Sequence, residues 1–288
     1  MRFGICCGPG SFAPEGAGDA LAGISVMMRI LEKARVDYLE FSVGQLSPEG
    51  PEDEFEKLRR AMAPYPIRVE AFNCFIPAHH RITGPDVDVP KVLSYCREAL
   101  RRCRVLGGQV VVLGSAGARK LPEGFDPAFG LRQFVAFCAE LGPVADEIGI
   151  DIAIEPLNWN EDNLINTIEQ GIRVVDVVHH PRIRLLADLY HITQNREPID
   201  TVAAAGSRLA HVHVADQGRE APGFGDPSEA DFIGLFRSLH LAGYDARCSY
   251  EGKMDAIAER LAPLIAHLRC RNQGTAERTE SQNAPYID

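Results

Sequence analysis

Four side chains that can bind a metal ion lie at the ends of successive hydrophobic segments in the second half of the chain. The segments read IAIEPLN, RLLADLYH, LAHVHVAD and RCSYEG, and they supply Glu155, Asp188, His213 and Glu251. Three carboxylates that point at one another repel, which raises their pKa values unless a cation holds them. Three carboxylate oxygens with one imidazole nitrogen suit Mn²⁺ first, and Mg²⁺ or Co²⁺ next. The pattern therefore predicts a site for one divalent metal ion.

The alternation of residues within these segments indicates which side chains share a face. Side chains in a β-strand point alternately to opposite faces, so residues two apart lie together. Glu155 thus shares a face with the small Ala153, whereas Ile154 points the other way. His213 shares a face with His211, which we expect to be a hydrogen-bonded histidine of the core. The predicted metal ligands can therefore all point to the inside of a barrel.

Short hydrophobic segments alternate with amphipathic stretches along the chain, which indicates a repeated β/α unit. The predicted strands are Phe3–Cys7, Tyr38–Val43, Arg68–Phe75, Val110–Gly114, Ile150–Leu157, Ile183–Leu189, Leu209–Ala215 and Arg247–Glu251. The predicted helices lie near Ala20–Ala34, Glu52–Met62, Val89–Leu106, Gly130–Ile148, Thr167–His179, Asp200–Ala205, Glu229–Ala242 and Ala256–Leu268. Eight such units predict a single domain of the α/β class, a (β/α)8 TIM barrel over residues 1–270, with its active site at the carboxyl ends of the strands. A doubly wound sheet is the alternative, but it normally has about six strands, and no GxGxxG follows the first strand here.

Two segments outside the candidate site carry further expectations. In the helix predicted for Val89–Leu106, apolar residues recur at helical spacing, which leaves Arg97, Arg101 and Arg102 for solvent. Residues 271–288 are polar and lack apolar periodicity. We expect this segment to be a disordered tail, or an arm that docks on a second subunit of a homo-oligomer.

The composition limits the kinds of partner. The formal net charge of −10 argues against binding to the phosphate backbone of nucleic acids. The 8 cysteines form no CxxC pair and lie mostly in apolar segments, which is typical of free thiols in a reducing compartment. The first apolar segment is too short for a signal peptide, and no segment has transmembrane length. We therefore expect a cytoplasmic protein with a small-molecule ligand and neither nucleic acid nor membrane as a partner.

A second group of polar residues follows the predicted strand ends. Glu161, His191 and Arg219 each come three or six residues after one of the predicted metal ligands. At those positions they would lie over the mouth of the site and offer polar groups to a hydroxylated ligand. His79 and His80 follow the third strand, and the loop after a strand faces the same mouth in a barrel. For four aromatic residues nearby we expect packing rather than ligand contact: Phe72, Phe75, Trp159 and Phe224.

Together these motifs resemble those of the sugar phosphate isomerase/epimerase superfamily, the xylose isomerase-like TIM barrels. The closest resemblance is to ketose 3-epimerases of the tagatose and allulose type. It covers residues 1–268 in layout and is most specific over residues 155–251. EPLN with Glu161, then LLADLYHI, HVHVADQGR, a GxG before Asp226 and the final SYEG occur in the family's order. Many members carry arginine after EPLN, where this chain has Trp159.

The resemblance implies an enzyme that epimerises or isomerises a polyhydroxylated substrate through a metal-stabilised enediolate. By resemblance, the metal ligands are Glu155, Asp188, His213 and Glu251, and the substrate contacts are Glu161, His191 and Arg219. Glu155 and Glu251 would also form the acid/base pair. Because the enediolate is planar, one carboxylate can remove a proton from one face while the other returns a proton to the opposite face.

The same scaffold admits two other classes of enzyme. In a lyase the enediolate expels a β-leaving group, as in the inosose dehydratases and C-glycoside-cleaving enzymes of this superfamily. Nucleases similar to endonuclease IV assemble a histidine-rich cluster of several zinc ions, whereas four ligand positions stand out here. The products separate an epimerase from a dehydratase, because an epimer conserves mass and a dehydrated product loses water.

Overall fold

The β/α alternation of the sequence produces a closed barrel. The computed structural model describes residues 1–13, 20–224 and 230–283. Within these ranges, eight parallel strands pair in chain order, and β8 closes the barrel by pairing with β1. The strands are β1 (Arg2–Cys6), β2 (Tyr38–Ser42), β3 (Val69–Asn73), β4 (Val110–Leu113), β5 (Asp151–Ile154), β6 (Ile183–Asp188), β7 (Leu209–Val214) and β8 (Arg247–Tyr250). Each strand lies close to its predicted range, so the predicted TIM barrel is confirmed.

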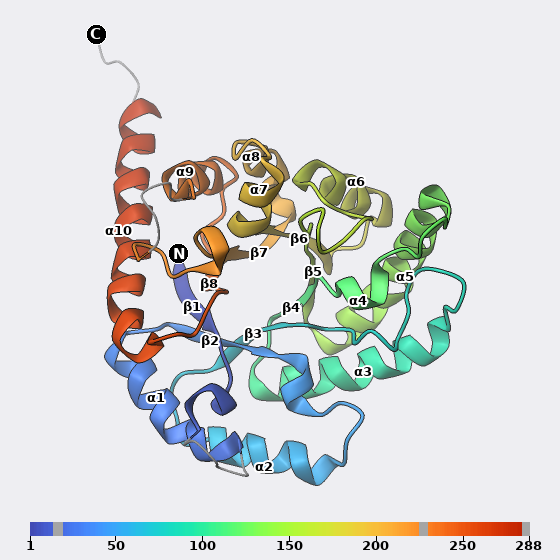
Figure 1. Ribbon diagram of the computed structural model, residues 1–288, viewed down its shortest axis with the longest axis horizontal. Coiled ribbons are helices and arrows are strands. Elements are labelled where there is room, and N and C mark those ends of the chain that lie inside the picture. The colour runs from blue at the N-terminus through green and yellow to red at the C-terminus, as the bar shows by residue number, and fades with distance from the viewer. Residues whose placement is uncertain (14–19, 225–229, 284–288) are drawn as a thin grey trace.

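Helices surround the strands in chain order, from α1 (blue) to α10 (red) in Figure 1. In the described residues they are α1 (Ile24–Lys33), α2 (Glu52–Met62), α3 (Val89–Leu106), α4 (Ala116–Arg119), α5 (Pro127–Ile148), α6 (Ile168–Val178), α7 (Leu189–Asn195), α8 (Thr201–Ala205), α9 (Phe232–Leu241) and α10 (Ile257–Asn283). Short 3-10 helices are η1 (Pro9–Phe12), η2 (Ala20–Gly23), η3 (Val43–Leu46), η4 (Gly206–Arg208) and η5 (Gln217–Arg219). Across the described ranges we find no helix with the length and apolar character needed to cross a membrane.

The ends of α3 show how the local sequence sets these bounds. The Asp88 side chain accepts a hydrogen bond from the main-chain N–H of Lys91 (3.1 Å), which satisfies a donor that the first helical turn leaves free. Gly107 ends the helix with a φ of 108°, in the left-handed region where glycine carries no Cβ penalty. The predicted and observed bounds of α3 agree because both of its ends are marked in the sequence.

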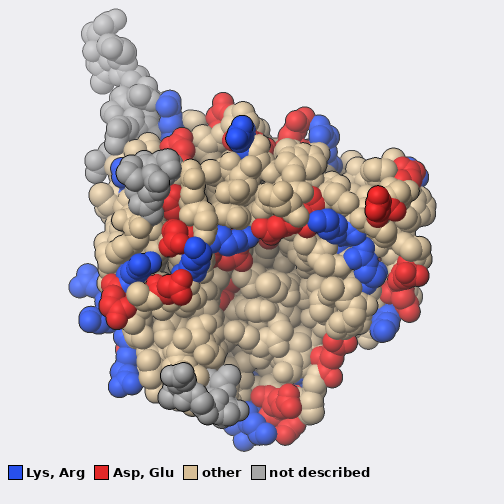
Figure 2. Space-filling view, viewed as in Figure 1, with Lys and Arg blue, Asp and Glu red and all other residues tan. Residues whose placement is uncertain are grey.

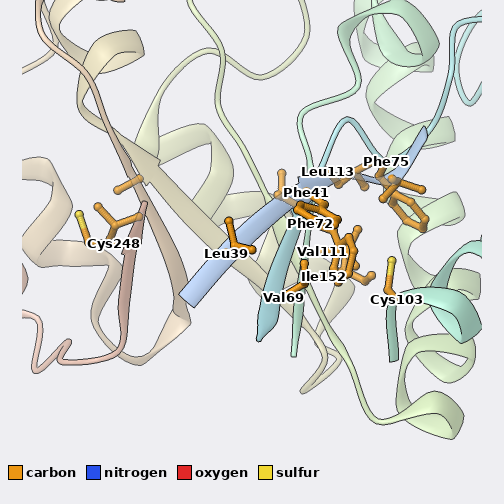
Figure 3. Packing of buried hydrophobic residues seen from close by; sticks show 14 of the residues in the cluster. Leu39, Phe41, Val69, Phe72, Phe75, Cys103, Val111, Leu113, Ile152 and Cys248 are labelled. Atoms are coloured by element: carbon orange, nitrogen blue, oxygen red, sulfur yellow. The ribbon is translucent and has the colours of Figure 1, made fainter. Parts of the chain in front are cut away.

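Alternate residues of the strands build two packed layers. Side chains on the outer faces pack against the helices, and Figure 3 shows Phe41, Phe72 and Val111 of neighbouring strands next to one another. A separate buried cluster fills the inside of the barrel: Tyr38, Ala71, Val110, Val112, Ala153, Leu186 and Ala210. Because this interior is packed, a ligand has room only at an end of the barrel.

The prediction that Arg102 faces solvent is wrong, because its side chain is only 3% exposed. The guanidinium donates to the main-chain oxygens of Leu46 (2.9 Å) and Gly50 (3.1 Å). Its Nε also pairs with Glu98 at 2.6 Å. The two carbonyls belong to the end of η3 and to the loop before α2. Arg102 therefore fastens the segment after β2 to α3, and these bonds satisfy the buried charge.

The last helix is longer than the sequence predicted. Instead of ending near Leu268, α10 continues to Asn283. It therefore includes residues 271–283, for which the sequence predicted a disordered tail. These residues are polar, but arginine, glutamine, alanine and glutamate are favourable in helices, so a helix can continue without an apolar face. Residues 284–288 lie outside the described ranges, as does Asp226.

Candidate active site

The four predicted metal ligands meet at the carboxyl ends of β5 to β8. Glu155 and Glu251 directly follow β5 and β8. Asp188 ends β6, and His213 comes just before the last residue of β7. One ligand atom from each side chain lies within 4.8 Å of the others. Nδ1 of His213 is 3.3 Å from Oε1 of Glu155 and 3.5 Å from Oε2 of Glu251.

Burial and the nearby charge of Glu251 disfavour negative charge on Asp188 and Glu155. Burial, together with Glu251, raises the pKa of Asp188 to about 6. Burial also raises the pKa of Glu155, a rise that His213 opposes and Glu251 reinforces. A divalent cation bound here would lower the pKa values of the carboxylates, because it favours the ionised form of every carboxylate that contacts it.

Glu40, a buried residue of β2 that the sequence analysis missed, orients the histidine of the site. Its carboxylate oxygens lie 2.9 Å from Nε2 of His213 and 2.7 Å from Nε2 of His211. Burial alone would raise the pKa of Glu40, but His213 and His211 hold it well below its usual value. The ionised carboxylate accepts the Nε2–H of His213, so Nδ1 faces Glu155 and Glu251. His211 is the hydrogen-bonded core histidine that the sequence predicted.

The residues present fit a divalent cation. Among the described residues, Oδ2 of Asp188 is buried without a hydrogen-bond partner. Nε2 of His191 lies 3.6 Å from it, beyond hydrogen-bond range. The contact between His213 and Glu40 is the arrangement in which a metal-binding histidine donates its second N–H to a carboxylate. Three oxygen ligands and one nitrogen ligand suit Mn²⁺ or Mg²⁺ better than a metal that prefers thiolates.

Arg219 connects two acidic residues at the edge of the site. Its NH1 donates to Oε2 of Glu251 (3.0 Å), and its NH2 donates to Oε1 of Glu161 (3.4 Å). Its guanidinium also lies over the ring of Tyr190, 4.3 Å from the ring centre. The second oxygen of Glu251 accepts a hydrogen bond from the Asn73 side chain (2.8 Å). Both oxygens of Glu251 have donors, so its carboxylate is oriented before a ligand binds.

His191 presents one defined nitrogen to the site. The main-chain N–H of Asn158 donates to Nδ1 of His191 (3.1 Å), which therefore acts as an acceptor. Burial lowers the pKa of His191, so the ring is neutral at pH 7 and carries its proton on Nε2. Nε2 lies 4.0 Å from Oε1 of Glu155, on the side of the candidate metal site. His191 can thus donate one hydrogen bond to an oxygen of a bound ligand.

A buried ion pair holds the main chain around Glu155. Arg119 of α4 pairs with Asp162 at 2.8 Å, and both side chains are fully buried. The same guanidinium donates to the main-chain oxygens of Leu113 (3.0 Å) and Glu155 (2.8 Å). At Gly114, which follows β4, an added Cβ atom would collide with Oε2 of Glu155. The end of β4 therefore both supports Glu155 and leaves space for its carboxylate.

These residues line a cavity at the carboxyl ends of the strands. The cavity has a volume of about 880 Å³ and is lined by Glu155, Glu161, His191, Arg219 and Glu251, among others. Figure 2 shows acidic and basic side chains around a hollow near the centre of this face. Four non-glycine residues of the lining have a positive φ: Ser47 (48°), Cys74 (50°), Ser115 (38°) and Arg219 (59°). Such backbone conformations cost free energy and often occur at functional sites.

The sequence predicted a packing role for four aromatic residues near the site, and two of them have it. Phe72 and Phe75 are fully buried in the outer layer between strands and helices. Trp159 and Phe224 are exposed and are not among the described residues that line the cavity. The residues that the sequence analysis missed are polar instead, namely Glu40, Asn73, Arg119 and Asn158.

Comparison with curated proteins gives relatives that are named as sugar epimerases. The D-psicose 3-epimerase of Ruminiclostridium cellulolyticum is 29% identical over 154 residues, 51% of this chain and 52% of the relative. The L-ribulose 3-epimerase of Methylomonas sp. is 26% identical over 91% of this chain and 86% of the relative. The 3-dehydro-D-guloside 4-epimerase of Escherichia coli is 32% identical over 57% of this chain and 64% of the relative. The matched region thus spans about half the length of the first relative and most of the second.

A solved structure and a family profile agree on the architecture. A D-psicose 3-epimerase crystallised in the presence of D-fructose superposes with a TM-score of 0.79 and 16% sequence identity, over 94% of this chain and 99% of that chain. At this identity the similarity supports a shared fold. The profile of the xylose isomerase-like TIM barrel family matches residues 28–270, which is most of the chain. The protein therefore belongs to the xylose isomerase-like TIM barrel family.

Proposed function

We propose that this protein is a divalent-metal-dependent sugar epimerase that inverts the carbon next to a ketone, as a ketose 3-epimerase does. The observation that carries the proposal is that Glu155 and Glu251 reach one cavity from different sides. Their strands, β5 and β8, are separated by β6 and β7 in the barrel. The relatives named D-psicose 3-epimerase and L-ribulose 3-epimerase support a sugar as the substrate.

The two glutamates divide the proton transfer between the two faces of the substrate. A divalent cation held by the four ligands would polarise the substrate carbonyl and so make the neighbouring C–H more acidic. One glutamate removes that proton and leaves a planar enediolate. The other glutamate supplies a proton to the opposite face, which inverts the carbon. Nε2–H of His191 and the guanidinium of Arg219 would bind substrate oxygens and hold the sugar between the two carboxylates.

The experiment that tests this proposal is an analysis of products in D₂O. Protein with Mn²⁺ is incubated with ketoses, inososes and C-glycosides, and each mixture is followed by NMR. The expected result is a ketose epimer of unchanged carbon skeleton that carries deuterium at the inverted carbon. A product that has lost water or an aglycone would show that the protein is a lyase and not an epimerase. No conversion of any ketose by metal-loaded protein would contradict the proposal.

Metal binding is expected to raise the thermal stability of the protein. A ligand that binds only the folded state stabilises it by about 2.7 kcal/mol when its concentration is 100 times the dissociation constant. Mn²⁺ should therefore raise the unfolding temperature of the wild type but not of Asp188→Ala. Asp188 also caps α7 by accepting from the Tyr190 N–H, so its replacement lowers stability even without metal. The quantity to compare is therefore the change in unfolding temperature when Mn²⁺ is added to each protein. Asp176→Ala, which removes an exposed carboxylate, should keep the full shift; equal shifts in both variants would reject the site.

Arg219→Ala should weaken substrate binding or turnover without removing the metal. Hydrogen bonds to charged groups contribute about 1.5–3 kcal/mol, so we expect kcat/KM to fall roughly ten- to hundredfold. The measurements are steady-state kinetics and the metal content per chain. Arg173→Ala, an arginine that pairs with Glu169 on an exposed helix face, should have no effect. Wild-type kinetics in Arg219→Ala would show that this residue has no part in the reaction.

A further inference from the structure

A second cluster of polar side chains lies in the same cavity, away from the four candidate metal ligands. We call it the distal cluster: Glu49 in the loop before α2, and His79 and His80 in the loop after β3. Nε2 of each histidine lies 3.0 Å from a carboxylate oxygen of Glu49. Glu49 and His79 line the cavity. In the barrel order, β2 and β3 face β6 and β7, so the distal cluster lies across the mouth from Asp188 and His213.

The distal cluster has the residue types of a metal site, but its hydrogen bonding argues against one. Among the described residues, Nδ1 of the buried His80 has no hydrogen-bond partner. A metal ion on Nε2 of His80 would require the ring proton to move to Nδ1, where no acceptor could form a hydrogen bond with it. His213 differs, because its second nitrogen donates to Glu40 at 2.9 Å. The distal cluster is therefore better suited to bind a neutral polar ligand.

The distal cluster offers both acceptors and a ring surface to such a ligand. The Glu49 side chain is 53% exposed, and two histidine donors occupy only part of the acceptor capacity of its two oxygens. The imidazole N–H donors hold the carboxylate in place. Burial alone would raise the pKa of Glu49, but the hydrogen bonds from His80 and His79 outweigh it and lower that pKa. The rings of His79 and His80 lie 4.4 Å apart, and those of His80 and Tyr95 4.8 Å apart. His80 and Tyr95 are buried behind the exposed ring of His79, whose side chain is 58% exposed. A carboxylate that accepts from hydroxyl groups, next to an exposed ring that can contact C–H groups, suits a sugar ring.

The size of the cavity leaves room for such a ring beyond the reacting sugar. Pockets for drug-sized ligands have volumes of roughly 300–1,000 Å³, and this cavity, at about 880 Å³, is near the upper end. A single ketose is smaller than such a ligand, so a ketose bound between Glu155 and Glu251 would leave the distal side empty. One relative is named as acting on a guloside, which is a sugar in glycosidic linkage.

We propose that the distal cluster and Tyr95 form a subsite for a second sugar unit, so that the preferred substrates are glycosylated ketoses rather than free ones. This inference rests on the proposed epimerase function. The reacting ketose lies between Glu155 and Glu251, and its glycosyl substituent crosses the mouth to Glu49. Binding energy from the second unit then contributes to holding the ketose in position for proton transfer.

The test compares D-fructose with 6-O-glucosyl-fructose, which has the same carbonyl and neighbouring carbon but carries an extra glucosyl unit. We expect the wild type to have a kcat/KM roughly ten- to hundredfold higher for the glucosylated ketose, from hydrogen bonds to a charged group. Glu49→Gln should lose that advantage while its kcat/KM for D-fructose stays unchanged. His79→Phe, which keeps a ring but removes its N–H, should lose part of it. Glu123→Gln removes a carboxylate outside the cavity and should resemble the wild type.

Other outcomes would overturn the subsite. Equal kcat/KM for both sugars in the wild type would show that the protein does not recognise the second sugar unit, while the epimerase proposal would still stand. An equal loss for both sugars in Glu49→Gln assigns Glu49 a structural role. A second divalent ion per chain that disappears in Glu49→Gln makes the distal cluster a metal site. If neither sugar reacts, the epimerase proposal fails, and saturation-transfer NMR with 6-O-glucosyl-fructose tests the subsite separately. Signals from the glucosyl protons that appear with the wild type and are lost in Glu49→Gln would support the subsite. Absence of these signals in the wild type would overturn it.

Discussion

Replacing Glu155 or Glu251 by glutamine is expected to abolish most epimerisation, because glutamine keeps an oxygen for the metal but cannot act as a base. Loss of a general base typically costs on the order of 10²–10⁴-fold in rate. Each variant should still bind some Mn²⁺, which separates lost proton transfer from lost metal. The measurements are the rate of epimer formation and the metal content per chain. Glu220→Gln, which alters a partly exposed carboxylate paired with Lys253, should keep the wild-type rate.

The two variants need not fail in the same way. Removal and return of a proton on one face requires a single base, so one variant should still exchange the acidic C–H of the substrate for deuterium without forming the epimer. Glu251 is the more constrained position, since Asn73 and Arg219 donate to its two oxygens and a glutamine NH₂ must face one of these donors. Wild-type epimerisation by both metal-loaded variants would show that these glutamates are not the bases.

Arg119→Met is expected to destabilise the fold by about 3–5 kcal/mol, because it leaves Asp162 as an uncompensated buried charge. The substitution also removes the donors to the main-chain oxygens of Leu113 and Glu155. The thermal midpoint should fall on the order of 10 °C, and activity should fall at temperatures where the variant is still folded. Differential scanning calorimetry, with activity measured at a lower temperature, tests both effects.

Two control variants isolate the cause of this loss. Arg173→Met makes the same chemical change at an exposed ion pair and should alter stability by less than about 0.5 kcal/mol. Arg119→Met combined with Asp162→Leu removes both buried charges and should recover part of the stability. If Arg119→Met unfolds at the wild-type temperature, the buried pair has no role in holding Glu155.

The barrel and the proximity of the four candidate ligands were predictable because both depend on local patterns. Strand ends are marked where a hydrophobic segment meets a polar residue, as at Glu155 and Asp188. The order of strands in a barrel then follows the order of the chain, so residues at successive strand ends must be neighbours. The bounds of α3 were predictable for the same reason, since Asp88 and Gly107 mark its two ends.

The missed residues have partners that are distant in sequence. Glu40 contacts His211 and His213 across the inside of the barrel, and both histidines belong to β7, which is not paired with β2. A glutamate within the apolar segment YLEFS was the available signal, because a buried carboxylate requires a partner. Arg102 and Arg119 are buried because they donate to main-chain carbonyls at the end of η3 and at the end of β4, and helical spacing does not reveal such acceptors.

Two glycines that line the cavity differ in what they would allow in the diversification of this protein. At Gly44 an added methyl group would lie 3.7 Å from the nearest side-chain atom, Oγ of Ser42, which is ordinary contact. At Gly114 the same methyl group would occupy the space of the Glu155 carboxylate. A library designed to change substrate range can therefore include alanine at position 44, whereas alanine at position 114 should lower activity, because the Glu155 carboxylate would have to move. The wall of the cavity thus has space for an added methyl group after β2 and no such space after β4.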